Sequence, residues 1–78
     1  MKVRVECYAG YKAEEIPRRF HIGSRKVEVS DIIDAWLAPD YRYFKVLGDD
    51  DATYILRNEI EEDVWEIHVF ESNSGKVP

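Results

Sequence analysis

FHIGSRKVEV, residues 20–29, is the stretch that decides the fold of this chain. Apolar and polar residues alternate on both sides of Gly23-Ser24. A period of two is what a half-buried strand requires, because successive side chains point to opposite faces of a sheet. Gly23 supplies the positive φ that a two-residue hairpin turn needs. The stretch therefore predicts two antiparallel strands joined by a tight turn.

The same pattern recurs twice along the chain. Residues 43–56 alternate on both sides of the turn signal Gly48-Asp49-Asp50-Asp51, and residues 65–70 alternate after the acidic run 59–63. Short strands separated by polar turns are typical of a small all-β antiparallel meander, either a curled sheet or an SH3-like, partly open barrel. The six expected strands are 2–8, 17–22, 26–29 with its continuation, 41–47, 52–57 and 64–71.

Residues 30–37 are compatible with two structures. Apolar residues at 32, 33, 36 and 37 have helical spacing, and Ser30 or Asp31 would cap one short helical turn. Alternatively, the third strand continues through a bulge near Asp31, which would turn Ile32 and Trp36 toward the core. We favour the bent strand, because only one turn of helix fits before Pro39.

Alternation also predicts which side chains face the core at the two ends of the chain. In the first strand Val3, Val5 and Cys7 share the inner face. In the last strand Trp65, Ile67 and Val69 are expected to point inward, and His68 and Phe70 to share the outer face. Pro17 cannot donate to a strand ladder, so we expect it to start the second strand.

Length and composition indicate one small domain. The chain has 78 residues, of which we assign 1–71 to a single β domain and 72–78 to a flexible C-terminal tail. The lone Cys7 excludes an internal disulfide and fits a reducing compartment. No apolar run approaches the roughly 20 residues of a membrane span. We therefore expect a cytoplasmic protein without a membrane partner.

Charge is distributed unevenly. Residues 1–30 carry an excess of three positive charges and residues 31–78 an excess of eight negative charges, for a net charge of −5. The acidic total disfavours charge-driven binding of nucleic acid. Four cations nevertheless lie in or beside the first hairpin: Arg18, Arg19, Arg25 and Lys26. They either pair with acidic neighbours across the sheet or form an anion or nucleic-acid contact.

Side chains that could support catalysis or hold a metal are few. Cys7 and His68 are expected on opposite faces, which prevents the hydrogen bond that an activated cysteine needs. His21 and His68 lack the spacing of metal ligands, and residues 49–51 lack the ligand pattern of a calcium loop. The sequence contains no phosphate-binding glycine motif. We expect neither an enzyme nor a bound metal or cofactor.

Aromatic residues say more about function than the candidate catalytic and metal-binding side chains do. Tyr8, Tyr11, Tyr41, Tyr43 and Phe70 fall on loops or on faces that should be partly wet. Tyrosine beside arginine is typical of protein-recognition surfaces, and the same rings could stack on unpaired bases. Cross-strand packing alone would also favour them. We predict a non-enzymatic protein- or peptide-interaction module that uses Tyr8, Tyr41, Tyr43 and Phe70; the alternative is an accessory nucleic-acid-binding module that uses the basic hairpin.

A string of short motifs covers residues 16–70: Pro17-Arg18-Arg19-Phe20, Asp34-x-Trp36, Tyr43-Phe44-x-Val46, Thr53-Tyr54-x-Leu56 and Trp65-x-Ile67. In order and spacing this string resembles a family of small uncharacterised bacterial domains with a PRRF…DxW…YFxV…TYxL…W pattern. The resemblance implies a small β-rich bacterial protein and assigns no catalytic residues. Some relatives in that family are encoded near specialised DNA polymerases, which adds support to the nucleic-acid alternative.

Overall fold

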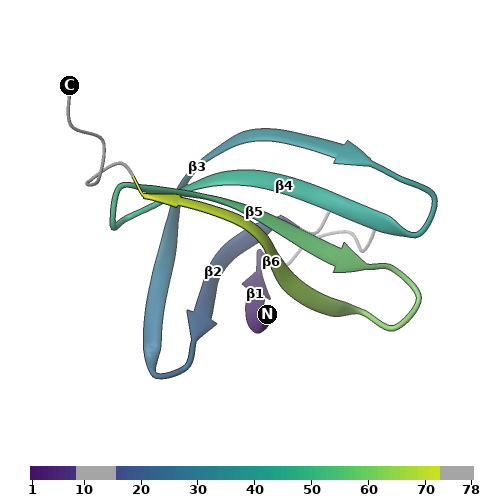
Figure 1. Cartoon of the computed structure of the whole chain (residues 1–78), viewed down its shortest axis with the longest axis horizontal. Helices are drawn as coiled ribbons and strands as arrows, with labels where there is room; N and C mark the ends of the chain where they lie inside the picture. The colour runs from purple at the N-terminus through teal and green to yellow at the C-terminus, as the bar shows by residue number, and fades with distance from the viewer. Residues whose placement is uncertain (9–15, 73–78) are drawn as a thin grey trace.

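Six antiparallel strands in chain order close into a small barrel in the computed structural model, which describes residues 1–8 and 16–72 (Figure 1). The strands are β1 (Lys2–Cys7), β2 (Pro17–Ile22), β3 (Arg25–Leu37), β4 (Tyr41–Gly48), β5 (Ala52–Glu59) and β6 (Val64–Ser72). The predicted all-β meander is confirmed, and β2 starts at Pro17, as the sequence predicted. Among the described residues no helix is long and apolar enough to cross a membrane.

The turns form where the sequence changes from alternation to polar residues. In the β2–β3 hairpin Ile22 pairs with Arg25, and Gly23 at its centre has a φ of 59°. Between β4 and β5 the Asp51 amide donates to the Gly48 carbonyl at 3.0 Å, and Asp51 has a φ of 65°. Aspartate is one of the few residues with a side chain that tolerates this left-handed conformation.

β3 connects the two halves of the barrel, because it is long enough to belong to both. Its first residues, Arg25–Glu28, pair with β2, and the remainder to Leu37 pairs with β4. Figure 1 shows β3 bending from the β1–β2 side into the sheet formed with β4, β5 and β6. The ladder that closes the barrel, between β1 and β6, is short. It consists of the pairs Lys2 with Glu66 and Val3 with Trp65.

The core lies between the two halves. Its buried members come from five of the six strands: Phe20, Val27, Phe44, Val46, Ala52, Tyr54, Leu56 and Trp65. Val3, Val5 and Cys7 pack against this cluster as expected. Asn58 is the one buried polar side chain among the described residues; its Oδ1 accepts from Arg42 and its Nδ2 donates to Asp63 at 3.1 Å.

The segment 31–37 is strand throughout, so the helical alternative is wrong. The expected bulge is present, because Val29 pairs with Gly48 and Asp31 with Leu47, and Ile32 packs against the core. A second bulge follows between Ile32 and Asp34. It reverses the alternation, so Trp36 pairs with outward-facing Tyr43 and is 41% exposed. The inward placement of Trp36 is therefore wrong.

The physical reason lies in Asp34. Continued alternation from Ile32 would have placed this carboxylate on the inner face, where an unpaired charge is costly. With the second bulge Asp34 is exposed, and its Oδ1 accepts the Ala35 amide at 2.8 Å. Trp36, two residues farther on, moves to the outer face with it.

β6 also departs from the predicted alternation, because it contains a bulge. Leu56 pairs with Ile67 and Ile55 with Val69, so His68 is an extra residue in β6. Val69 consequently lies outward and is 46% exposed, against the prediction that it points inward. Phe70 pairs with buried Tyr54 instead of sharing the outer face with His68. The predicted tail 72–78 and Tyr11 fall outside the described residues, apart from Ser72, at which β6 ends.

Candidate functional site

The hairpin cations contact acidic side chains or an aromatic ring. Arg19 bridges Glu6 at 2.7 Å and Glu28 at 2.9 Å from neighbouring strands. The Arg25 guanidinium lies 3.4 Å from Asp50, and the Lys26 ammonium 3.6 Å from Glu28. Arg18, in a bulge of β2, lies 5.4 Å from the centre of the Tyr8 ring. These ion pairs weigh against a phosphate site at the hairpin.

The outer side of β1, β2 and β3 is therefore a neutralised charge network. His21 Nε2 lies 2.6 Å from Glu6, which also accepts from Arg19. These two hydrogen bonds lower the pKa of the Glu6 carboxyl to about 2. The hydrogen bond from Arg19 likewise lowers the pKa of Glu28, and the cross-strand positions of all these groups explain why they meet.

A second polar cluster closes the end of the barrel near the β4–β5 turn. The Tyr54 hydroxyl donates to Asp50 Oδ2 at 2.5 Å and accepts from Arg25 at 3.0 Å. Burial, together with the neighbouring carboxylate, raises the pKa of Tyr54 to about 12. Asp50 Oδ1 also accepts the Ala52 amide at 3.1 Å. Because Tyr54 is fully buried, this cluster anchors the turn.

The four aromatic residues predicted to bind a partner do not form one surface. Tyr41 and Tyr43 lie together on the outer side of β4, with ring centroids 6.2 Å apart. Tyr8 follows β1 and contacts Arg18. Phe70 lies across from Tyr54 with a centroid distance of 4.9 Å and is 53% exposed. The structure thus brings two of the four together.

Further rings join Tyr41 and Tyr43 on the outer side of the β3–β6 sheet. Trp36 stacks on Tyr43 with a centroid distance of 5.2 Å and an interplanar angle of 3°, and His68 meets Tyr43 edge-on at 5.7 Å. We call Trp36, Tyr41, Tyr43 and His68 the aromatic face. Such stacked and edge-on pairs hold the rings in fixed orientations, so the surface is preorganised.

Arg57 anchors the aromatic face from β5. Its guanidinium lies 4.6 Å from the centre of the Tyr41 ring and donates to Glu66 at 2.5 Å. Hydrogen bonds with Glu66 and with Tyr43 raise the pKa of Arg57 above its usual value. The guanidinium therefore stays charged and keeps the two tyrosines in place.

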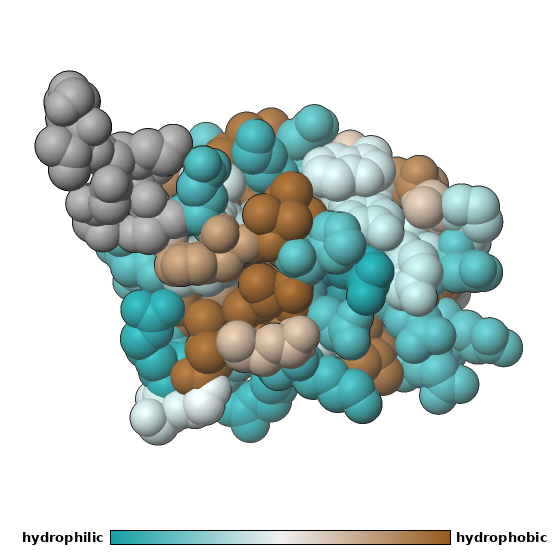
Figure 2. All heavy atoms as spheres, viewed as in Figure 1, coloured by the Kyte–Doolittle hydropathy of each residue, from teal (hydrophilic) through white to brown (hydrophobic). Residues whose placement is uncertain are grey.

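A second exposed apolar surface lies where the barrel closes. Figure 2 shows hydrophobic side chains gathered between β6 and the β2–β3 hairpin, beside the N-terminus. Exposed apolar residues on or beside β6 are Met1, whose carbonyl accepts the Ile67 amide, and Val69 and Phe70, which lie on opposite faces of the strand. This region contains no stacked aromatic pair among the described residues apart from the tilted Phe70–Tyr54 contact.

Within residues 1–8 and 16–72 no group of three or more His, Cys, Asp and Glu side chains is arranged to hold a metal ion. Cys7 packs against the core, and His68 lies on the aromatic face beside Tyr43.

Trp36, the more exposed ring of the stack, is not among the binding residues that the sequence predicts, because one bulge in β3 would turn it inward and the strand has two. A signal was present in Asp34, since a strand that turns Ile32 and Trp36 inward also buries the carboxylate between them. His68 was assigned to the outer face correctly, but nothing in the sequence placed it against Tyr43.

No known protein family, no curated protein and no solved structure matches this chain. The resemblance to small bacterial domains stays a prediction.

Proposed function

We propose that this chain is a non-enzymatic module that binds a partner protein through the aromatic face. The observation that carries the proposal is the exposed, parallel stack of Trp36 on Tyr43, held by Tyr41 and Arg57. Tryptophan, tyrosine and arginine dominate the binding energy of protein interfaces. A rigid sheet that presents them loses little conformational entropy when it binds.

Neighbouring residues extend this surface. Ile33 in the second bulge of β3 is 48% exposed; Leu37 is 75% exposed but pairs with Arg42, on the face opposite Trp36. On its other side the second half of β3, from Val29 onward, pairs with none of the described strands. An exposed strand edge beside exposed apolar side chains is a common docking element for an extended segment of another protein.

Single-stranded nucleic acid is the alternative partner, since bases could stack on the same rings. The net charge of −5 and the ion pairs of the hairpin cations favour a protein partner over a polyanion. We therefore propose binding of a partner protein, and not of nucleic acid, as the function.

Affinity capture with the full chain as bait tests the proposal. Trp36→Ala should lower recovery of a specific partner at least tenfold, because a central aromatic anchor contributes about 2 kcal/mol or more. Ile16→Ala is the matched control, since Ile16 is also 41% exposed but precedes β2. Circular dichroism verifies that both variants fold.

Equal recovery by wild type and Trp36→Ala would contradict the proposal. Phe70→Ala separates the two apolar surfaces. If Phe70→Ala abolished capture while Trp36→Ala did not, the surface beside the N-terminus would be the binding site instead of the aromatic face.

A further inference from the structure

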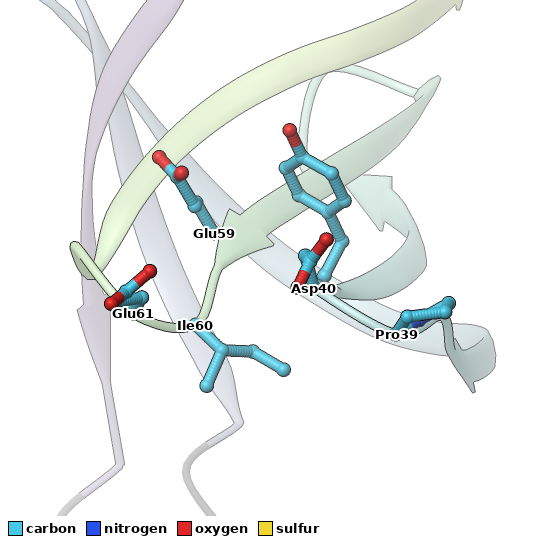
Figure 3. A pocket seen from close by; sticks show the side chains of 6 residues that line it. Pro39, Asp40, Glu59, Ile60 and Glu61 are labelled. Carbon is cyan, nitrogen blue, oxygen red and sulfur yellow. The ribbon is translucent and has the colours of Figure 1, made fainter.

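A hollow of about 420 Å³ borders the aromatic face at Tyr41. Two turns form it, the one before β4 and the one after β5, which the Ile60 amide joins by donating to the Asp40 carbonyl at 3.1 Å. Its lining is Pro39, Asp40, Tyr41, Glu59, Ile60 and Glu61. Figure 3 shows the carboxylates of Asp40, Glu59 and Glu61 distributed around this space. Three carboxylates beside an aromatic ring are the chemistry that receives a cation.

The three carboxylates form no ion pair with any residue that the structure describes. This distinguishes them from Glu6, Glu28, Asp50 and Glu66, each of which contacts an arginine. Those four carboxylates are therefore neutralised by arginines of the part of the chain that the structure describes. The hollow beside the aromatic face thus presents three carboxylates that no described cation neutralises.

Tyr41 and Glu59 also line a second hollow. It combines the same ring with carboxylates, and there a cation of the protein itself, Arg57, occupies the site. It is lined by Lys2, Tyr41, Arg57, Glu59, Glu62, Val64 and Glu66. There the Arg57 guanidinium lies over the Tyr41 ring at 4.6 Å and pairs with Glu66. Tyr41 thus already binds one guanidinium beside a carboxylate, whereas the first hollow offers the ring and carboxylates alone.

Spacing joins the hollow to the stack. The rings of Tyr41 and Tyr43 are 6.2 Å apart. Residues i and i+2 of an extended peptide are about 7 Å apart and point to the same side. A segment that lies along β4 can therefore place one side chain at Tyr41 and the next side chain of that face on the Trp36–Tyr43 stack.

We propose that the occupant of the aromatic face is a basic, extended segment of a partner protein. Its arginine or lysine enters the hollow lined by Asp40, Glu59 and Glu61, and an apolar side chain two residues away packs on Trp36 and Tyr43. Charge complementarity selects this occupant over an acidic or neutral segment. The inference rests on the proposed function and specifies the chemistry of its partner.

An NMR titration of the labelled full chain tests this assignment. The probe is the peptide acetyl-Ser-Arg-Ser-Phe-Ser-amide, compared with the same peptide that carries Glu in place of Arg. The arginine peptide should shift the amides of Trp36, Tyr41, Tyr43 and Glu59, and should bind at least tenfold more tightly than the glutamate peptide at low salt.

Substitutions in the protein test whether the carboxylates of the hollow bind the arginine of the peptide. Glu59→Gln combined with Glu61→Gln should weaken binding of the arginine peptide by about 1.4- to fivefold per carboxylate, the range measured for solvent-exposed ion pairs. The matched control is Asp51→Asn, which removes one negative charge at the β4–β5 turn and keeps a residue that tolerates the positive φ. This control should leave the affinity unchanged.

Equal affinity for the arginine and glutamate peptides would overturn the proposal of a basic occupant. So would a loss of affinity in Asp51→Asn equal to that in the Glu59→Gln, Glu61→Gln double variant. So would a short oligothymidylate that shifts the same amides more strongly than the arginine peptide. If the peptides fail to discriminate while Trp36→Ala still abolishes partner capture, the proposed function stands and the basic occupant falls.

Discussion

Replacing Tyr54 by phenylalanine removes a single hydroxyl from the core and tests how the barrel end is anchored. The hydroxyl donates to Asp50 at 2.5 Å and accepts from Arg25 at 3.0 Å, and the Tyr54 side chain is fully buried. Phenylalanine keeps the ring contacts with Phe20 and Phe70. The substitution therefore isolates the polar contribution of this cluster.

The structure sets the magnitude. A hydrogen bond to a charged group stabilises a fold by about 1.5–3 kcal/mol. The side chains of Asp50 and Arg25 are 25% and 55% exposed. Water can therefore replace part of the hydrogen bonding that they lose when the Tyr54 hydroxyl is removed. We expect a loss of about 2 kcal/mol in the free energy of unfolding, near the lower end of that range. In a domain of this size it corresponds to a fall in Tm of about 8–16 °C.

Urea and thermal unfolding measure the effect, with Tyr41→Phe on the outer face of β4 as the control. A double-mutant cycle with Asp50→Ala isolates the pair, since contacting groups couple whereas independent ones add. A loss below about 0.5 kcal/mol for Tyr54→Phe, or strict additivity with Asp50→Ala, would refute the reasoning.

Alkaline unfolding gives the same pair an independent signature. The folded state raises the pKa of Tyr54 to about 12, from an ordinary value of 10.0. A raised pKa stabilises the fold fully below the unfolded value, and that stabilisation is lost as pH rises from 10.0 toward 12. Tyr54→Phe should lack this component of the alkaline decline.

Three further predictions concern other parts of the barrel. Because the folded state lowers the pKa of Glu6 from 4.5 to about 2, its stabilisation is present above pH 4.5 and is lost as pH falls toward 2; acid unfolding of Glu6→Gln should lack this component. Gly48→Ala places a Cβ 2.6 Å from Asp50 Oδ1 and 2.7 Å from Val27 Cγ1, so chemical denaturation should reveal a loss of about 1–3 kcal/mol, and an unchanged midpoint would contradict the crowding. Asp51→Gly relieves a φ of 65° and should change stability by less than about 1 kcal/mol in either direction, whereas Asp51→Val should cost clearly more.

Local chemistry alone was sufficient to predict most of the fold. Alternation identified all six strands, and Gly23 identified the tightest hairpin, because strand periodicity and turn conformation depend on neighbouring residues in the chain. The same reasoning placed Phe44 and Val46 on one face and Tyr41 and Tyr43 on the other.

What alternation could not supply was the number of bulges. A single extra residue reverses every later side chain in a strand, and it is favoured only when the whole strand is paired and its charges must avoid the core. The additional residues in β3 and β6 turned Trp36 and Val69 outward and placed Phe70, which stays exposed, across from Tyr54. The candidate site depends on the first of these reversals.

The sequence by itself determined an all-β meander, its turns and the two tyrosines of β4. Only the tertiary structure decided that Trp36 stacks on Tyr43, that Arg57 lies on Tyr41, and that the hairpin cations meet carboxylates from other strands. The physical reason is that periodicity is a property of one strand. The aromatic face combines residues of β3, β4 and β6, and they become neighbours only when pairing fixes the register between strands.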